Sequence, residues 1–196
     1  MKLGYASGLA ALIAGMAALP LASQAAPQSC TAGTPTPASY TWNFQAEASR
    51  VLSGLQVDAA KAQYLADKLQ TFSLDANVDW QLHANQLAAL KREVDDMGRR
   101  LCRLEQIRPV AAPWQQKAID DAASSVRLMA DNVQDAINFL NEYHRNFWEP
   151  AYRHNVSNVF RESGQLSQSV KSLEQFAKVH SEDLQLEKEL SVGGKS

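Results

Sequence analysis

Four histidines and two cysteines are the residues of this chain whose types could support chemistry. If its helices are arranged antiparallel, His83 and His144 come to the same end and face each other. Two imidazoles together with a carboxylate can hold Zn²⁺ or Cu²⁺, so this pair is the candidate metal site. The competing interpretation is that His83 is a core residue at the end of a helical seam.

The spacings around these histidines match no common metal, haem or nucleophile motif. A carboxylate-bridged di-iron bundle needs Glu-x-x-His on two helices, and no histidine here has Glu or Asp three residues before it. The sequence also contains neither His-x-x-x-His nor Cys-x-x-Cys-His. We therefore assign no catalytic residue and no cofactor, leave cofactor-binding residues unknown, and expect a protein that is not an enzyme.

The N-terminal residues predict export. Lys2 is the only charged residue before Glu47, and an apolar run from Leu3 to Leu21 leads to small residues at positions −3 and −1, Ser23 and Ala25. This order is typical of a bacterial signal peptide cleaved after Ala25. We expect a periplasmic or secreted protein with no transmembrane span in the mature chain.

Export makes the two cysteines informative. In an oxidising compartment Cys30 and Cys102 are expected to form a disulfide, because both would lie near the end of the bundle where the first helix begins. The bond would close a loop of roughly 70 residues and stabilise the fold by about 4 kcal/mol. The alternative is two free or intermolecular thiols.

The helices that position these histidines and cysteines are predicted from the spacing of apolar residues. These residues recur at alternating steps of three and four, the pattern of helices packed lengthwise as in a coiled coil. Prolines fall in the breaks between these runs, and Pro113 and Pro150 suit the first turn of a helix. Each helix would be ~45–55 Å long. The predicted helices span 43–72, 78–107, 113–146 and 150–188.

Short connections between these helices predict an all-α fold, a long antiparallel (up-down-up-down) four-helix bundle after the cleaved signal peptide. The hydrophobic fraction of 45% excludes a disordered chain, and 19 Lys+Arg against 21 Asp+Glu argue against nucleic-acid binding. The predicted organisation is a signal peptide at 1–25, a flexible Pro/Thr/Ser-rich tether at 26–41, the bundle domain at 42–190 and a disordered tail at 191–196.

The helical seams predict which residues face each other. In the second hairpin Leu87 is opposite Leu140, and the seam of the fourth helix continues through His180 and Leu184. In the first hairpin Gly54 is opposite Gly98. Because glycine inside a helix costs about 1 kcal/mol, we interpret this pair as a close backbone approach.

Two side-chain groups mark the bundle ends. An aromatic group at the His83 end forms either a hydrophobic cap or a ligand pocket; it comprises Phe72, Trp80, Tyr143, Phe147, Trp148 and Tyr152. At the other end, basic residues of the second helix are expected to pair with acidic residues of the fourth. These are Arg99, Arg100, Arg103 and Arg108 on one side, and Glu182, Asp183, Glu187 and Glu189 on the other.

The functional interpretation is an exported non-enzymatic helical-bundle protein that acts by protein–protein or envelope-surface interaction. Its partner would be another envelope protein or a second copy of the chain. Leu128 and Phe139 lie off the third seam, where they would either widen the core or form a dimer face. The alternative is a ligand-binding bundle, for metal, haem or a small apolar molecule, with its site at the His83/His144 aromatic end.

Overall fold

The computed structural model describes residues 43–75, 77–144 and 146–193, with side-chain environments up to residue 189. All the regular structure in these residues is helical, which confirms the predicted all-α class. The predicted export signal, tether and Cys30 lie outside the described residues. The elements are α1 (Phe44–Phe72), α2 (Trp80–Ile107), the short 3₁₀ helix η1 (Arg108–Val110), α3 (Pro113–Tyr143) and α4 (Pro150–Gly193).

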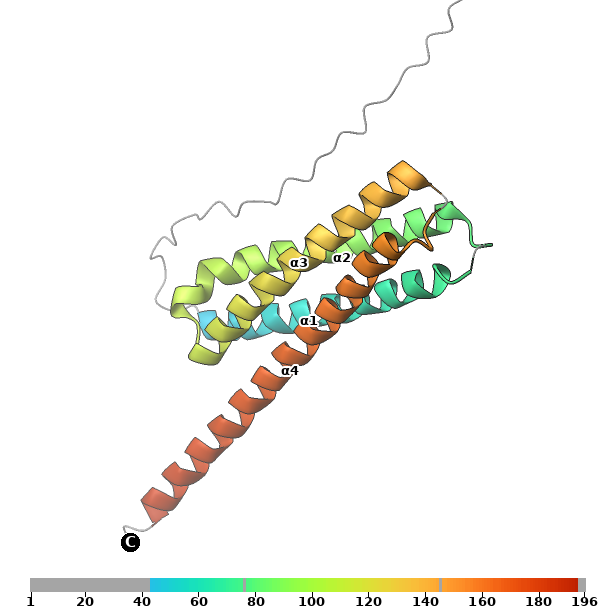
Figure 1. The fold of residues 1–196 in the computed structure, drawn as a ribbon. Helices are drawn as coiled ribbons and strands as arrows, with labels where there is room; N and C mark the ends of the chain where they lie inside the picture. The colour runs from blue at the N-terminus through green and yellow to red at the C-terminus, as the bar shows by residue number, and fades with distance from the viewer. Residues whose placement is uncertain (1–42, 76, 145, 194–196) are drawn as a thin grey trace, which may run out of the picture.

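The four long helices pack side by side in an antiparallel ring (Figure 1). Neighbours along the chain are in contact, and α4 returns to contact α1. The short connections between successive helices explain this order, because a chain that turns within a few residues must run back along the helix that it has just left.

Local sequence sets the helix ends. The side chain of Asn43 accepts a hydrogen bond from the Ala46 backbone N–H at 3.0 Å, and that of Asp79 accepts one from Gln81 at 3.1 Å. These caps satisfy backbone donors that have no partner in the first turn of a helix. Pro113 and Pro150 occupy first helical positions, as predicted.

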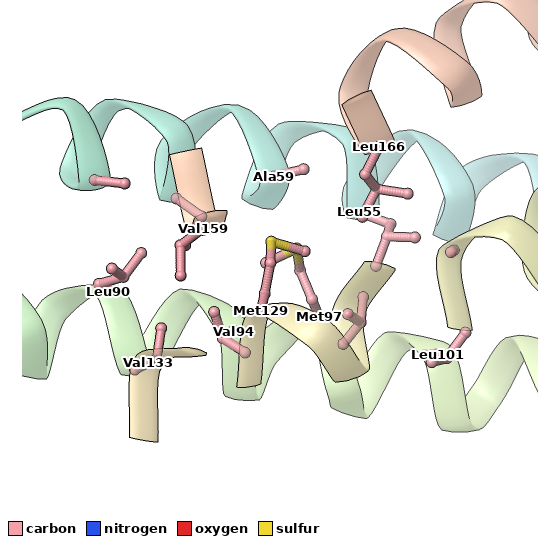
Figure 2. Packing of buried hydrophobic residues seen from close by; sticks show 14 of the residues in the cluster. Leu55, Ala59, Leu90, Val94, Met97, Leu101, Met129, Val133, Val159 and Leu166 are labelled. Carbon is pink, nitrogen blue, oxygen red and sulfur yellow. The ribbon is translucent and has the colours of Figure 1, made fainter. Parts of the chain in front are cut away.

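The core is a continuous line of apolar side chains from all four helices. Met97 of α2 and Met129 of α3 are fully buried at its centre and point into the same interior as Leu55 and Leu166 (Figure 2). The predicted seams of the second and third helices therefore supply the core, because a step of three or four residues returns a side chain to the same face of a helix. In α1 the core also takes in Leu52, Ala59 and Ala66, which are fully buried beside the predicted seam.

The fourth helix departs from the prediction. Its last side chains in the core are Val170, which is buried, and Leu173, which packs partly against the core. The helix nevertheless continues to Gly193, beyond the predicted end at 188. His180 and Leu184, which were predicted to continue the bundle seam, are exposed. The reason is that α4 extends beyond the other three helices at this end of the bundle (Figure 1).

We call residues 175–189 of α4 the arm. Figure 1 shows it projecting past the end of the bundle at which α1 begins. At 1.5 Å per residue the arm is about 22 Å long. Apart from Ala177, every side chain of the arm is exposed. None of the described helices is both long enough and apolar enough to span a membrane.

Candidate functional site

His83 is the centre of the aromatic end of the bundle. It lies in the first turns of α2 with its side chain fully buried, and its Nδ1 atom is 3.0 Å from the hydroxyl oxygen of Tyr152 on α4. Its ring stacks on Phe147, with centroids 4.1 Å apart, and meets Phe72 of α1 edge-on. His83 therefore joins three helices and one interhelical turn.

Burial controls the protonation of His83 and Tyr152. Desolvation lowers the pKa of His83 to about 4, and the nearby Phe72 backbone opposes part of this shift. Desolvation also raises the pKa of Tyr152 above its usual range. Both groups are consequently neutral at physiological pH. The Nε2 atom of His83 is buried without a hydrogen-bond partner in the described part of the chain.

His144 occupies a different environment from His83. It is the exposed residue that ends α3, and its ring lies 5.5 Å from that of Trp80. Within the described residues no group of three or more His, Cys, Asp or Glu side chains could hold a metal ion. The metal site at His83 and His144 thus stays a prediction, and its third ligand is not among the described residues.

The aromatic side chains of this end separate into an inner and an outer set. Phe147 and Tyr152 are buried, whereas Tyr143 and Trp148 are exposed. Phe139 joins the group, with its ring 4.9 Å from Tyr143 and 6.0 Å from Tyr152. Sequence analysis placed Phe139 off the seam and left its role open; in the structure it packs against the core.

Ion pairs between the middle of the bundle and its opposite end link α2 and η1 to the neighbouring helices, and their partners differ from the predicted ones. Arg100 Nε lies 2.6 Å from the buried carboxylate of Asp58, and Arg103 Nε lies 2.6 Å from Glu47, so both link α2 to α1. Arg108 binds Asp120 of α3 through two hydrogen bonds of 2.6 and 2.7 Å. This guanidinium holds the pKa of the Asp120 carboxyl below its usual range.

The predicted pairing of these arginines with the acidic residues of α4 is wrong. Arg99 pairs with Asp96 on its own helix. Glu182 is on the arm, where it lies 4.0 Å from Lys178. The physical reason is the length of α4, which carries its acidic residues past the end of the bundle, away from α2.

The predicted backbone approach at Gly54 and Gly98 is also wrong. A Cβ atom at Gly98 would meet nothing within 4 Å, whereas one at Gly54 would lie 2.6 Å from Nη1 of Arg100. Gly54 therefore makes room for the guanidinium that reaches Asp58. Gly164 plays a similar part for the Gln63 side chain, a contact that sequence analysis missed.

The arm is the second candidate site. Four large apolar side chains of the arm are 54–65% exposed: Phe176, Val179, Leu184 and Leu186. At about 100° per residue they fall on one half of the helix. The rings of Phe176 and His180 stack with an interplanar angle of 12°, so this half carries two stacked rings beside its aliphatic side chains.

The charges of the arm are mostly negative. It contains four acidic residues against two lysines, Lys178 and Lys188. Lys178 and Glu182 lie on the half opposite Phe176, whereas Asp183 and Glu187 lie among the apolar side chains. An amphipathic helix of this kind suits a surface that is both apolar and basic.

Comparison with known proteins identifies no relative: no family model, curated sequence or solved structure matches this chain significantly. The functional argument therefore depends on the chain's own residues. A signal for the arm was present in the sequence, because Phe176, Val179 and Leu186 lie off the seam predicted for the fourth helix. A bundle helix that packs against its neighbours on one face needs only one row of apolar side chains, so a second row indicates another contact.

Proposed function

We propose that this protein is an exported, non-enzymatic helical bundle that acts by contact with another macromolecule through the arm. The observation that carries the proposal is the exposure of Phe176, Val179, Leu184 and Leu186 on one helix that projects from an otherwise packed bundle. Contiguous exposed apolar side chains are typical of interaction sites. The bundle provides a rigid base for the arm.

The buried polar groups support a structural role for the bundle. Asp58 and Glu47 are bound to arginines of α2. Gln115 donates hydrogen bonds to the Gln45 carbonyl at 2.7 Å and to Ser49 at 2.9 Å, which ties α3 to α1. Side chains that hold helices together in this way need no catalytic role to account for their burial.

Export and a Cys30–Cys102 disulfide are part of the proposal. Cys102 lies half-buried near the end of α2, at the end of the bundle where residue 43 leads into α1. Labelling thiols with and without reductant tests the bond. We expect label only after reduction, and two reactive thiols in the unreduced protein would contradict it.

The alternative, a ligand site at the aromatic end, has one observation in its favour, the unpartnered Nε2 atom of His83. Against it, the His83 ring is fully buried and stacked on Phe147, so a ligand could reach Nε2 only if the end opened. Metal analysis and an absorption spectrum of natively purified protein test this alternative. A bound metal or chromophore lost in a His83→Phe variant would establish it.

Photo-cross-linking in intact cells tests the proposed contact. A photoreactive residue at position 176 samples the apolar half of the arm, and one at position 178, two residues away, samples the polar half as a matched control. We expect adducts of defined mass from position 176 and few from position 178. No adduct at either position, or equal capture at both, would contradict contact through the apolar half.

A further inference from the structure

One bundle surface matches the arm in both charge and polarity. We define the outer stripe of α1 as Arg50, Val57, Lys61, Tyr64 and Lys68, whose spacings of seven, four, three and four residues place them on one line along the helix. Val57 and Tyr64 are 54% and 57% exposed. Lys68 Nζ lies 4.5 Å from the centre of the Tyr64 ring, so the stripe is apolar and basic.

The outer surface of α3 and a second arm match the arm less well. Leu128 of α3 is exposed, but Asp131 and Asp135 follow it, and all three lie on the solvent side of the helix. These carboxylates would repel an acidic arm. Two arms would repel each other for the same reason, since each carries an excess of negative charge.

The arm and the outer stripe of α1 also agree in length and in position. From residue 50 to residue 68 the stripe spans about 27 Å, against about 22 Å for the arm. Figure 1 shows that the arm leaves from the end at which α1 begins. Two copies related by a twofold axis near that end could therefore each extend an arm along the other's α1, and the two contacts would be identical.

We propose that the arm of one copy docks on the outer stripe of α1 in a second copy, and that the exchange is reciprocal. This inference rests on the proposed function and names the partner as the chain itself. Phe176 and its apolar neighbours would cover Val57 and Tyr64. The acidic side chains of the arm would lie near Arg50 and Lys68, whereas Lys61 is already within 3.6 Å of the carboxylates of Asp58 and Glu93.

A charge-exchange experiment tests the pairing by sedimentation equilibrium of the purified chain at several concentrations. One variant makes the stripe acidic, with Arg50→Glu and Lys68→Glu. The other makes the arm basic, with Glu182→Lys, Asp183→Lys and Glu187→Lys. Four of the five positions are exposed and Lys68 is half-buried, and circular dichroism checks that both variants remain helical.

The unchanged chain is expected to form a concentration-dependent dimer. Each variant alone is expected to dimerise about tenfold more weakly, because like charges then meet across both contacts. An equimolar mixture is expected to recover dimerisation, since a basic arm meets an acidic stripe and an acidic arm meets a basic stripe.

A matched pair of single changes tests the apolar half separately. Phe176→Glu and Gln185→Glu add the same charge to opposite sides of the arm, because nine residues at 100° per residue separate them by half a turn. We expect Phe176→Glu to weaken the dimer at least about tenfold and Gln185→Glu to have a much smaller effect. Equal effects of the two changes would contradict docking through this half.

Three outcomes would overturn the proposal: an unchanged chain that is monomeric at every concentration, an acidic-stripe variant that dimerises normally, or a mixture that does not recover. The second outcome would instead indicate pairing between arms. If the chain is monomeric but position 176 still cross-links to a different envelope protein in cells, the proposed function stands and only the identity of the partner is wrong.

Discussion

His83 is the buried residue whose protonation would disturb this molecule most. Its ring is enclosed by Phe72, Phe147 and Tyr152, with no carboxylate among these neighbours to balance a positive charge. Burial lowers its pKa to about 4, whereas an unfolded histidine titrates near 6.5. The unfolded chain therefore binds a proton more readily than the folded chain between these two values.

The first prediction is a specific acid sensitivity at this residue. The stabilisation due to neutral His83 is fully present above pH 6.5, and up to about 3 kcal/mol of it is lost as the pH falls to 4. Urea unfolding across this pH range measures the loss. A His83→Phe variant should show a shallower decline than the unchanged chain, whereas a His144→Phe variant should follow the unchanged chain.

The two glycines of the first hairpin give a second prediction at the residue scale. Gly98→Ala should stabilise the fold by about 0.5–1 kcal/mol, because nothing opposes the added methyl group and alanine favours the helix. Gly54→Ala should bring no such gain, because its methyl group would displace the Arg100 guanidinium from Asp58. Thermal unfolding compares them, and an equal gain at both positions would contradict the role given to Gly54.

Sequence reasoning at this scale succeeded for apolar residues and failed for polar ones. The seam placed Leu87 and Leu140 opposite each other, and both are buried in the core because burial follows helical periodicity. It did not identify Asp58 as the partner of Arg100, because the reach of a long charged side chain depends on the rotation of both helices. That rotation is not encoded in the spacing of apolar residues alone.

At the scale of elements, helix boundaries were predictable and the extent of packing was not. Prolines and caps fixed the starts of α3 and α4. The end of α4 was harder, because its seam continues past Val170 with residues that look suitable for a core. Only the lengths of the other helices, the longest of which has 31 residues against 44 in α4, show that Leu184 has nothing to pack against.

The third prediction concerns the contribution of the arm to stability. A chain that ends after Gln175 should unfold at nearly the same urea concentration as the full chain under conditions where the full chain is monomeric. The reason is that every large side chain between residues 176 and 189 is exposed. A chain that ends after Ser169 should lose several kcal/mol, since it also lacks the core contacts of Val170 and Leu173. A large loss on removing the arm alone would show that the arm folds back onto the bundle.

At the scale of the whole molecule, the up-down-up-down order was the most secure expectation. It depends only on four amphipathic runs and three short connections, and the helix contacts agree with it. The ring contacts Trp80–His144 and His83–Phe147 lie within one helical turn of the predicted register. The candidate site was less predictable, because an exposed apolar half of a helix becomes visible only once the core is placed.

We infer that the bundle provides stability and that the arm makes the contact with a partner. The bundle pairs the buried carboxylates of Asp58 and Glu47 with arginines of α2, whereas the arm exposes Phe176, Val179, Leu184 and Leu186. Association that covers these side chains would remove their apolar surface from water, at about 25 cal/mol for each Å². The favourable free energy of contact would therefore come mainly from the arm.

Hydrogen exchange of the arm at two protein concentrations tests the central claim most directly. In dilute solution the amides of residues 175–189 should exchange much faster than those of the bundle core, because an isolated helical segment of this length is marginally stable in water. At high concentration the same amides should become protected, while those around Leu90 and Met129 remain unchanged. Arm amides that are as protected as the core in dilute solution, or that gain no protection on concentration, would contradict an arm that is free in one copy and docked in a pair.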